Sequence, residues 1–199
     1  MDNKKKYWEP KLWDELRSRN PIKICAKCLV EHDSSGFFKI KSLEKEIRVY
    51  PKEEKIESED SALAADPDFQ LLIISYLLFA QHIEPIGKWI SEKDLKGGSL
   101  FFRGPHALPS VSLEKYFGNN PDLLREKGRE LGATELEFGD ISLCFPVLPL
   151  ISLTIVLWLK DDEFPARVTF MMDPSIEAHL PLDVISAMVQ SVTKKLISH

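Results

Sequence analysis

The sequence predicts an α+β fold, a single domain in which an antiparallel β-sheet carries helices mainly on one face. Three strand-like apolar runs, near 141–147, 151–159 and 166–172, are separated by short loops that favour antiparallel pairing. The run Phe69–Ala80 is apolar almost all round and too short to cross a bilayer, which indicates a buried core helix. From about residue 182 to the end, apolar residues recur at helical spacing.

The first part of the chain predicts helices followed by a hairpin. We expect residues 1–30 to form an N-terminal helical segment, in which Asn20-Pro21 marks the start of a second helix within the region 9–30. Apolar residues alternate with polar ones on both sides of a short polar turn in 31–52, which indicates a β-hairpin. The charged stretch 52–66 is weakly apolar, and we interpret it as a solvated connection.

The rest divides into a helical middle, 66–132, and a region of strands with a C-terminal helix, 140–199. Asp66-Pro67-Asp68 has the cap, the first-turn proline and the acidic residue expected where the core helix begins. Ser91–Asp94 has capping-box spacing and predicts a short helix that Gly97-Gly98 would end. A further helix is expected from Pro121 to Leu131, closed by Gly132.

Composition narrows the class of protein. The 199 residues are 44% hydrophobic, enough for one compact domain that folds without a disulfide or metal. The net charge of −5 and the absence of a basic stripe argue against a nucleic-acid partner. The basic start, Lys4–Lys6, has no apolar segment behind it, so we expect neither a signal peptide nor membrane insertion. The number of cysteines is three, which is odd and favours reduced thiols in a cytoplasm.

Cys25 and Cys28 are the candidate metal ligands. Their spacing puts both thiols on one face of a helix, where they could hold one edge of a metal site or form a disulfide. A structural zinc site needs four ligands, and the sequence has no second pair of this kind. We therefore favour a structural role, in which both thiols pack as small apolar side chains.

The candidate cofactor-binding residues are His106, His179 and Arg103. His106 follows Arg103 in the irregular segment "FFRGPHALP", and His179 lies in "DPSIEAHLPLD" before the last helix. An arginine beside a histidine could bind an anionic group, and either histidine could be an axial ligand of a corrinoid or haem. The alternative is that each is a loop histidine hydrogen-bonded to the backbone.

Three adjacent carboxylates, Asp161, Asp162 and Glu163, separate the strand-like runs "TIVLW" and "ARVTFMM". They fit an exposed hairpin tip, and the alternative is a cation site. We predict that the Phe164 ring folds back onto the core as a hydrophobic anchor. No nucleophile elbow, phosphate loop or dinucleotide fingerprint is present, so no residue is assigned a catalytic role.

The order of these motifs is similar to that of domain of unknown function family 3786, over about residues 10 to 198. The resemblance is carried by Trp158 with Asp161–Pro165, by a strand that ends at Asp173, and by Leu180-Pro181 before the last helix. It also rests on the segments "PIGKWISEKDLKGGSLFF", "YFGNNPDLL" and the long stretch from Leu131 to Pro181. The Cys25/Cys28 pair is not among these motifs.

The resemblance implies a setting rather than an activity. Members of the family are expected mainly in anaerobic bacteria and archaea, and some carry a four-iron–four-sulfur domain like that of corrinoid iron–sulfur proteins. It therefore implies a redox or corrinoid protein as partner. No iron–sulfur cluster is expected in this chain, because no such domain is found within it.

Three functional hypotheses follow. The first is a non-catalytic accessory or ligand-binding protein linked to anaerobic redox or corrinoid metabolism. The second is a tetrapyrrole-, corrinoid- or metal-binding protein with histidine or cysteine ligands. The third, an enzyme whose site is assembled only in space, has no motif in its favour.

Overall fold

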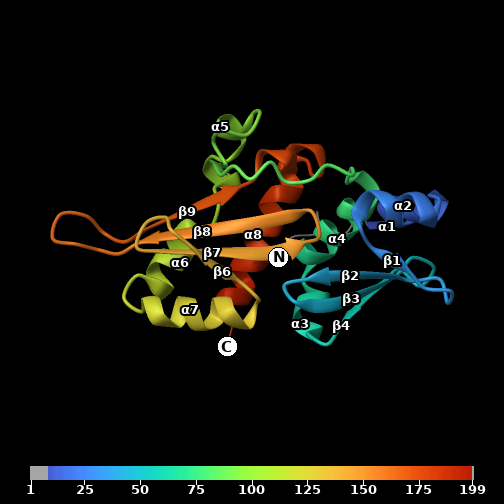
Figure 1. The fold of residues 1–199 in the computed structure, drawn as a ribbon, viewed down its shortest axis with the longest axis horizontal. Helices are drawn as coiled ribbons and strands as arrows, with labels where there is room; N and C mark the ends of the chain where they lie inside the picture. Colours follow the sequence, from blue (N-terminus) through green and yellow to red (C-terminus); the bar gives the residue numbers. More distant parts are fainter. Residues whose placement is uncertain (1–8, 199) are drawn as a thin grey trace.

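The computed structural model describes residues 9–198, so the basic start Lys4–Lys6 lies outside the described residues. The chain forms two antiparallel sheets surrounded by helices, which confirms the predicted α+β class (Figure 1). The smaller sheet contains, in order, β1 (Glu31–His32), β2 (Phe38–Ser42), β3 (Lys45–Tyr50) and β4 (Lys55–Ser58). The larger contains, from edge to edge, β5 (Ile90–Ser91), β9 (Arg167–Met172), β8 (Ile151–Trp158), β7 (Ile141–Leu148) and β6 (Thr134–Leu136).

The helices connect and cover these sheets. They are α1 (Glu9–Ser18), α2 (Pro21–Cys28), α3 (Ser61–Ala65), α4 (Pro67–Phe79), α5 (Gly98–Phe101), α6 (Ser110–Phe117), α7 (Pro121–Glu130) and α8 (Leu182–Ile197), with 3₁₀ turns η2 (Gly104–His106) and η3 (Pro174–Ala178). Within the described part of the chain, none of the helices is both long and apolar enough to span a bilayer.

The N-terminal helices and the hairpin form as expected. The Asn20 side chain accepts hydrogen bonds from the first backbone N–H groups of α2, which fixes the break between α1 and α2. In the hairpin, Phe38 lies opposite Val49 and Ile40 opposite Ile47, and all four are buried.

The expectation of a solvated connection over 52–66 is wrong, because this stretch forms β4 and α3. Ile56 lies opposite Val49 and is buried, so one apolar residue suffices to attach an otherwise charged strand to the sheet. The side chain of Asp60 accepts the N–H of Leu63 and thereby caps α3.

Helix α4 lies at the junction of the two sheets (Figure 1). This position explains why the helix is apolar almost all round. It packs against α8 and α1, and Leu72, Ile73 and Tyr76 are fully buried. Asp66 caps it through the N–H of Asp68. Near the C-terminal end of α8, the Lys194 ammonium lies 2.7 Å from an Asp66 oxygen and 2.6 Å from an Asp68 oxygen. These ion pairs fasten the two helices together.

The larger sheet is deeply buried at its central strand, β8. The consecutive residues from Leu153 to Leu157 in β8 are all buried, and consecutive side chains on a strand point to opposite faces. Figure 1 shows α8 passing behind this sheet and α7 lying below it. A backbone hydrogen bond of 3.0 Å from Leu43 to Pro146 connects the turn of the smaller sheet to the bulged end of β7. The strands thus belong to two connected sheets, whereas the sequence predicted one.

Around residue 91 the predicted short helix is also wrong. Only half of the capping box forms. Asp94 accepts the N–H and the hydroxyl of Ser91, but the Asp94 N–H donates to the Ser91 carbonyl, and Ser91 belongs to β5. Gly97, with φ +80°, precedes α5, so the two glycines begin a helix instead of ending one. Gly98 cannot be larger, because an added Cβ would lie 2.0 Å from the Glu92 carbonyl oxygen. The helix expected from Pro121 is confirmed as α7.

A mostly exposed strap, residues 81–89, runs between α4 and β5 without regular structure. The Asp173 carboxylate, at the end of β9, accepts the backbone N–H groups of Ile86, Gly87 and Lys88, and that of Ser175. Burial raises the pKa of Asp173, but these hydrogen bonds outweigh it and lower the pKa to about 2. One buried carboxylate thus holds the strap against the end of the sheet.

Candidate ligand-binding groove along β9

Two adjoining pockets follow the outer side of β9, and together we call them the β9 groove. The hairpin pocket, of about 580 Å³, is lined by Glu114, Asp140, Trp158, Leu159, Asp161, Phe164, Pro165, Ala166 and Arg167. The inner pocket, of about 490 Å³, is lined by Ser91, Glu92, Lys93, Phe102, Ala107, Leu108, Ser110, Glu114 and Arg167–Phe170. They share Glu114 and Arg167, so the two pockets meet at these side chains.

The loop between β8 and β9 protrudes from the end of the larger sheet (Figure 1). One Asp161 oxygen accepts the backbone N–H groups of Phe164, at 2.7 Å, and Glu163, at 2.8 Å. These bonds lower the pKa of Asp161 and form an Asx-type turn. All three carboxylates of the loop are exposed, in agreement with the interpretation as a solvated hairpin tip.

The prediction that Phe164 anchors the loop to the core is wrong, because 65% of its surface is exposed. The backbone at Phe164 is held by Asp161 instead, through the N–H bond and a 3.0 Å bond from the Asp161 N–H to the Phe164 carbonyl. The loop is therefore ordered by a polar turn, and its aromatic ring is left on the surface.

The floor of the hairpin pocket is held by side chains from three elements. The Arg167 guanidinium lies over the Trp158 ring, 4.8 Å from its centroid. One oxygen of Asp140, in the loop before β7, accepts the Leu159 N–H at 2.7 Å.

From α6, one oxygen of Glu114 accepts the Val168 N–H at 3.0 Å. In each of these carboxylates, as in Asp161, one oxygen accepts a backbone N–H and the other accepts none.

The inner pocket lies along the edge of the sheet. It touches the consecutive residues Val168, Thr169 and Phe170, and a pocket on one face would meet only alternate side chains. Strand β5 pairs only with Met171 and Met172, so the preceding part of β9 has no strand neighbour on this side.

The sequence-predicted residues Arg103 and His106 border the inner pocket, since their neighbours Phe102 and Ala107 line it. Both side chains are exposed, and the His106 ring stacks on Phe101 at a centroid distance of 4.7 Å. The groove thus brings this irregular segment and the acidic hairpin to the two ends of one surface.

His179 lies elsewhere, beside the strap. Its ring is only 1% exposed, and Nδ1 accepts the Gln81 N–H at 3.3 Å. Burial lowers the pKa of His179 and so favours the neutral ring that can accept this bond. A large cofactor could reach its ring only if the strap moved.

The cysteines also lie away from the groove. Cys28 is fully buried in α2, and its thiol lies 3.4 Å from the Tyr76 carbonyl oxygen, while the Tyr76 hydroxyl donates to the Cys28 carbonyl at 2.8 Å. Burial raises the pKa of Cys28 to about 12, which disfavours the thiolate that binds metals. Among residues 9–198, no cluster of three or more His, Cys, Asp or Glu side chains could hold a metal ion.

We expect the double variant Cys25→Ala/Cys28→Ala to keep the metal content of the wild-type protein. The free energy of unfolding should fall by about 1–3 kcal/mol, because only a small buried group and its bond to α4 are lost. Elemental analysis and urea unfolding of the two proteins measure both quantities. Stoichiometric zinc or iron that disappears in the variant would contradict the structural role.

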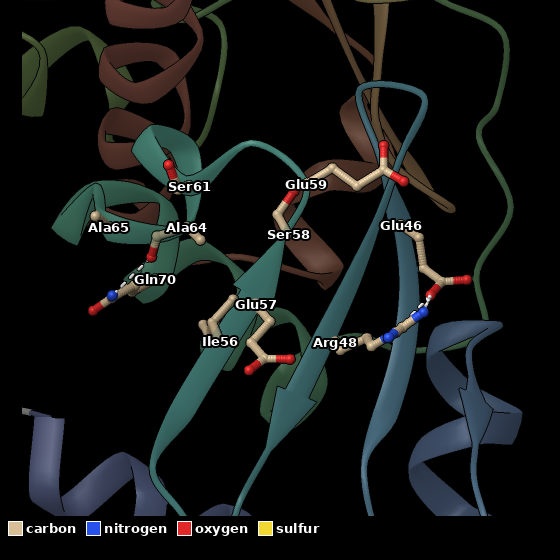
Figure 2. Close-up of a pocket in the computed structure, with 10 residues that line it drawn as sticks. All are labelled: Glu46, Arg48, Ile56, Glu57, Ser58, Glu59, Ser61, Ala64, Ala65 and Gln70. Atoms are coloured by element: carbon tan, nitrogen blue, oxygen red, sulfur yellow. Dashed lines mark hydrogen bonds and ion pairs between the residues drawn. The ribbon is translucent and has the colours of Figure 1, made fainter.

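A larger pocket, of about 800 Å³, lies between β3, β4, α3 and α4 (Figure 2). Two of its polar side chains are bonded within it: Arg48 donates to Glu46, and Gln70 donates to the Ala64 carbonyl, as Figure 2 shows. No aromatic residue is among those lining it. We regard the β9 groove as the better candidate, because exposed aromatic surface lies beside carboxylates there.

A protein-family model, Domain of unknown function (DUF3786), matches residues 20–195. The chain belongs to this family. No curated protein and no solved structure matches it.

In this DUF3786 protein, the motif residues Trp158 and Asp161–Pro165 belong to the hairpin that forms one end of the groove, and Asp173 holds the strap. Sequence reasoning missed Glu114, Asp140 and Arg167. No sequence signal marks Glu114, whose bond to Val168 joins positions 54 residues apart. Arg167 could have been suspected from its place just after Pro165, at the start of a strand.

Proposed function

We propose that this DUF3786 protein is a non-catalytic accessory or ligand-binding protein that holds its ligand in the β9 groove. The observation that carries the proposal is the groove itself, with exposed aromatic surface at one end and Phe102 and Ala107, which flank the Arg103–His106 segment, at the other. Ligand sites are concave, largely apolar and supplied with a few fixed polar groups. The groove has these properties, whereas its histidine, His106, is stacked on Phe101 and has no bonded nucleophile beside it.

We infer further that the ligand or partner belongs to anaerobic redox or corrinoid metabolism, in the cytoplasm. The support for the metabolic setting is the resemblance described above, in which related chains are joined to a corrinoid-protein-like iron–sulfur domain. A domain that is fused to such a module in some proteins is expected to work beside it when the two are separate chains. The support for the compartment is the odd number of free cysteines.

The proposal is tested by NMR titration of the full chain with two probes, hydroxocobalamin and a purified corrinoid iron–sulfur protein. We expect saturable amide shifts in residues 102–117 and 158–170 with at least one probe, and no chemical change of the probe. The control is the variant Ala166→Trp, in which the larger side chain fills the hairpin pocket beside β9 and should block these shifts. Absence of saturation with both probes, or shifts confined to other parts of the chain, would contradict the proposal.

A second candidate, a corrinoid- or haem-binding protein with a histidine ligand, is favoured by one observation. His106 is exposed beside the inner pocket, so its imidazole could approach a ring bound there. His179 is the poorer ligand because of its burial. Reconstitution with hydroxocobalamin or haemin should then give a visible band that shifts in His106→Ala and is unchanged in His179→Ala. A spectrum identical in both variants and in the wild-type protein would exclude histidine ligation.

A further inference from the structure

The hairpin pocket carries more negative than positive charge. Its lining includes the carboxylates of Glu114, Asp140 and Asp161 against a single cation, Arg167. The same loop also carries the exposed carboxylates of Asp162 and Glu163 and one exposed ammonium group, that of Lys160. Arg167 is already engaged with the Trp158 ring, so the surplus of carboxylates is not balanced within the pocket.

The same pocket offers apolar surface for more than a point charge. Phe164 is 65% exposed, and Pro165 and Leu159 also line the pocket.

 The Asx-type turn at Asp161 fixes this surface before anything binds, which reduces the entropy lost on association. A group with a long apolar stem and a cationic head would contact both the rings and the carboxylates.

We propose that the hairpin pocket is the docking site for an arginine side chain on an extended segment of a partner protein. The inference rests on the proposed function and names the chemistry that one end of the β9 groove recognises. Charge complementarity identifies the occupant as a cation, because the pocket lining presents three carboxylates against one guanidinium.

Arginine fits better than lysine for two reasons. A planar guanidinium can stack on the exposed Phe164 ring, as that of Arg167 already does on Trp158. Its five N–H donors can also reach more than one carboxylate at once, such as the Asp140 and Asp161 oxygens that do not accept backbone N–H groups. The groove continues along the β9 edge into the inner pocket, which gives the residues flanking the arginine a place to lie.

The test uses three synthetic peptides, acetyl-Gly-Leu-X-Leu-Gly-amide, with X as arginine, lysine or citrulline. Citrulline has nearly the shape of arginine without its charge, so it isolates the electrostatic contribution. Binding to the full chain is followed by the NMR signals of the Trp158 indole N–H and the Gly139 amide. We expect saturable binding of the arginine peptide, weaker binding of the lysine peptide, and about tenfold weaker binding of the citrulline peptide.

The variant is Asp161→Asn/Asp162→Asn/Glu163→Gln, in which the amide oxygen at 161 can still accept the backbone bonds of the turn. It should bind the arginine peptide about tenfold more weakly and unfold at the same urea concentration as the wild-type protein. The matched control, Glu53→Gln/Glu59→Gln/Glu84→Gln, removes three exposed carboxylates outside the groove and should leave the affinity unchanged.

Equal affinities for the arginine and citrulline peptides, or equal losses in the two triple variants, would overturn the inference. Binding of hydroxocobalamin or the corrinoid protein in the groove would then still support the proposed function. Conversely, charge-dependent peptide binding with no response to either of those probes would support the arginine site and contradict the corrinoid setting.

Discussion

The variant Asp173→Ala is expected to lower the free energy of unfolding by about 3 kcal/mol. The carboxylate accepts four backbone N–H groups, three of them from the strap, and it is only 7% exposed. Hydrogen bonds to a charged group are among the stronger ones, but the released strap can bond to water, which limits the loss. Urea unfolding measures the effect, and hydrogen exchange of residues 86–88 should rise in parallel.

The matched control is Asp161→Ala, which removes a carboxylate that also accepts backbone N–H groups but lies in an exposed turn. Its effect should stay below about 1 kcal/mol. If the two substitutions had equal effects, burial of the Asp173 bonds would not be what stabilises the strap.

The pH dependence of stability follows from the same carboxylate. The pKa of Asp173 is about 2 in the folded protein, compared with 3.8 for an unperturbed aspartate such as one in the unfolded chain. Folding therefore favours the charged form. Its contribution is therefore complete above about pH 4 and is lost as the pH falls towards 2. The difference corresponds to about 2.5 kcal/mol. In Asp173→Asn this part of the acid destabilisation should be absent, which unfolding curves at pH 5 and pH 2.5 would show.

The variant Phe145→Ala should lower the free energy of unfolding by more, about 4 kcal/mol, because the Phe145 ring in β7 is fully buried. Phe164→Ala makes the same chemical change at a ring that is 65% exposed, and should change stability by less than about 0.5 kcal/mol. Urea midpoints of the two variants measure the contrast. A loss of more than 2 kcal/mol in Phe164→Ala would mean that the ring does pack onto the core.

Much of the fold could be predicted because its signals are local. The cap at Asp66, the proline that follows it, and the apolar period of the last helix each lie within one element. β4 could not be predicted in this way, since its only strong apolar residue is Ile56, and pairing with β3 decides its conformation. The same holds for Ser91, which local spacing assigns to a helix and pairing with Met171 assigns to a strand.

The candidate site was harder to predict, because its members meet only in space. The acidic turn was recognisable from three adjacent carboxylates, whereas the exposed Phe164 was not, since an aromatic residue beside a proline equally fits a buried anchor. Glu114 and Asp140 lie in different elements and approach β8 and β9 through bonds to the backbone. Nothing in their local sequence distinguishes them from other surface carboxylates.

The most direct test of the β9 groove as the binding site is hydrogen exchange with and without a saturating corrinoid iron–sulfur protein. If the groove binds the partner, amides in residues 102–117 and 158–170 should exchange more slowly in the complex, and those in β3 and β4, at the larger pocket, should not change. Protection of β3, β4 and α3 with the groove unaffected would contradict the assignment and point to the pocket of Figure 2 instead.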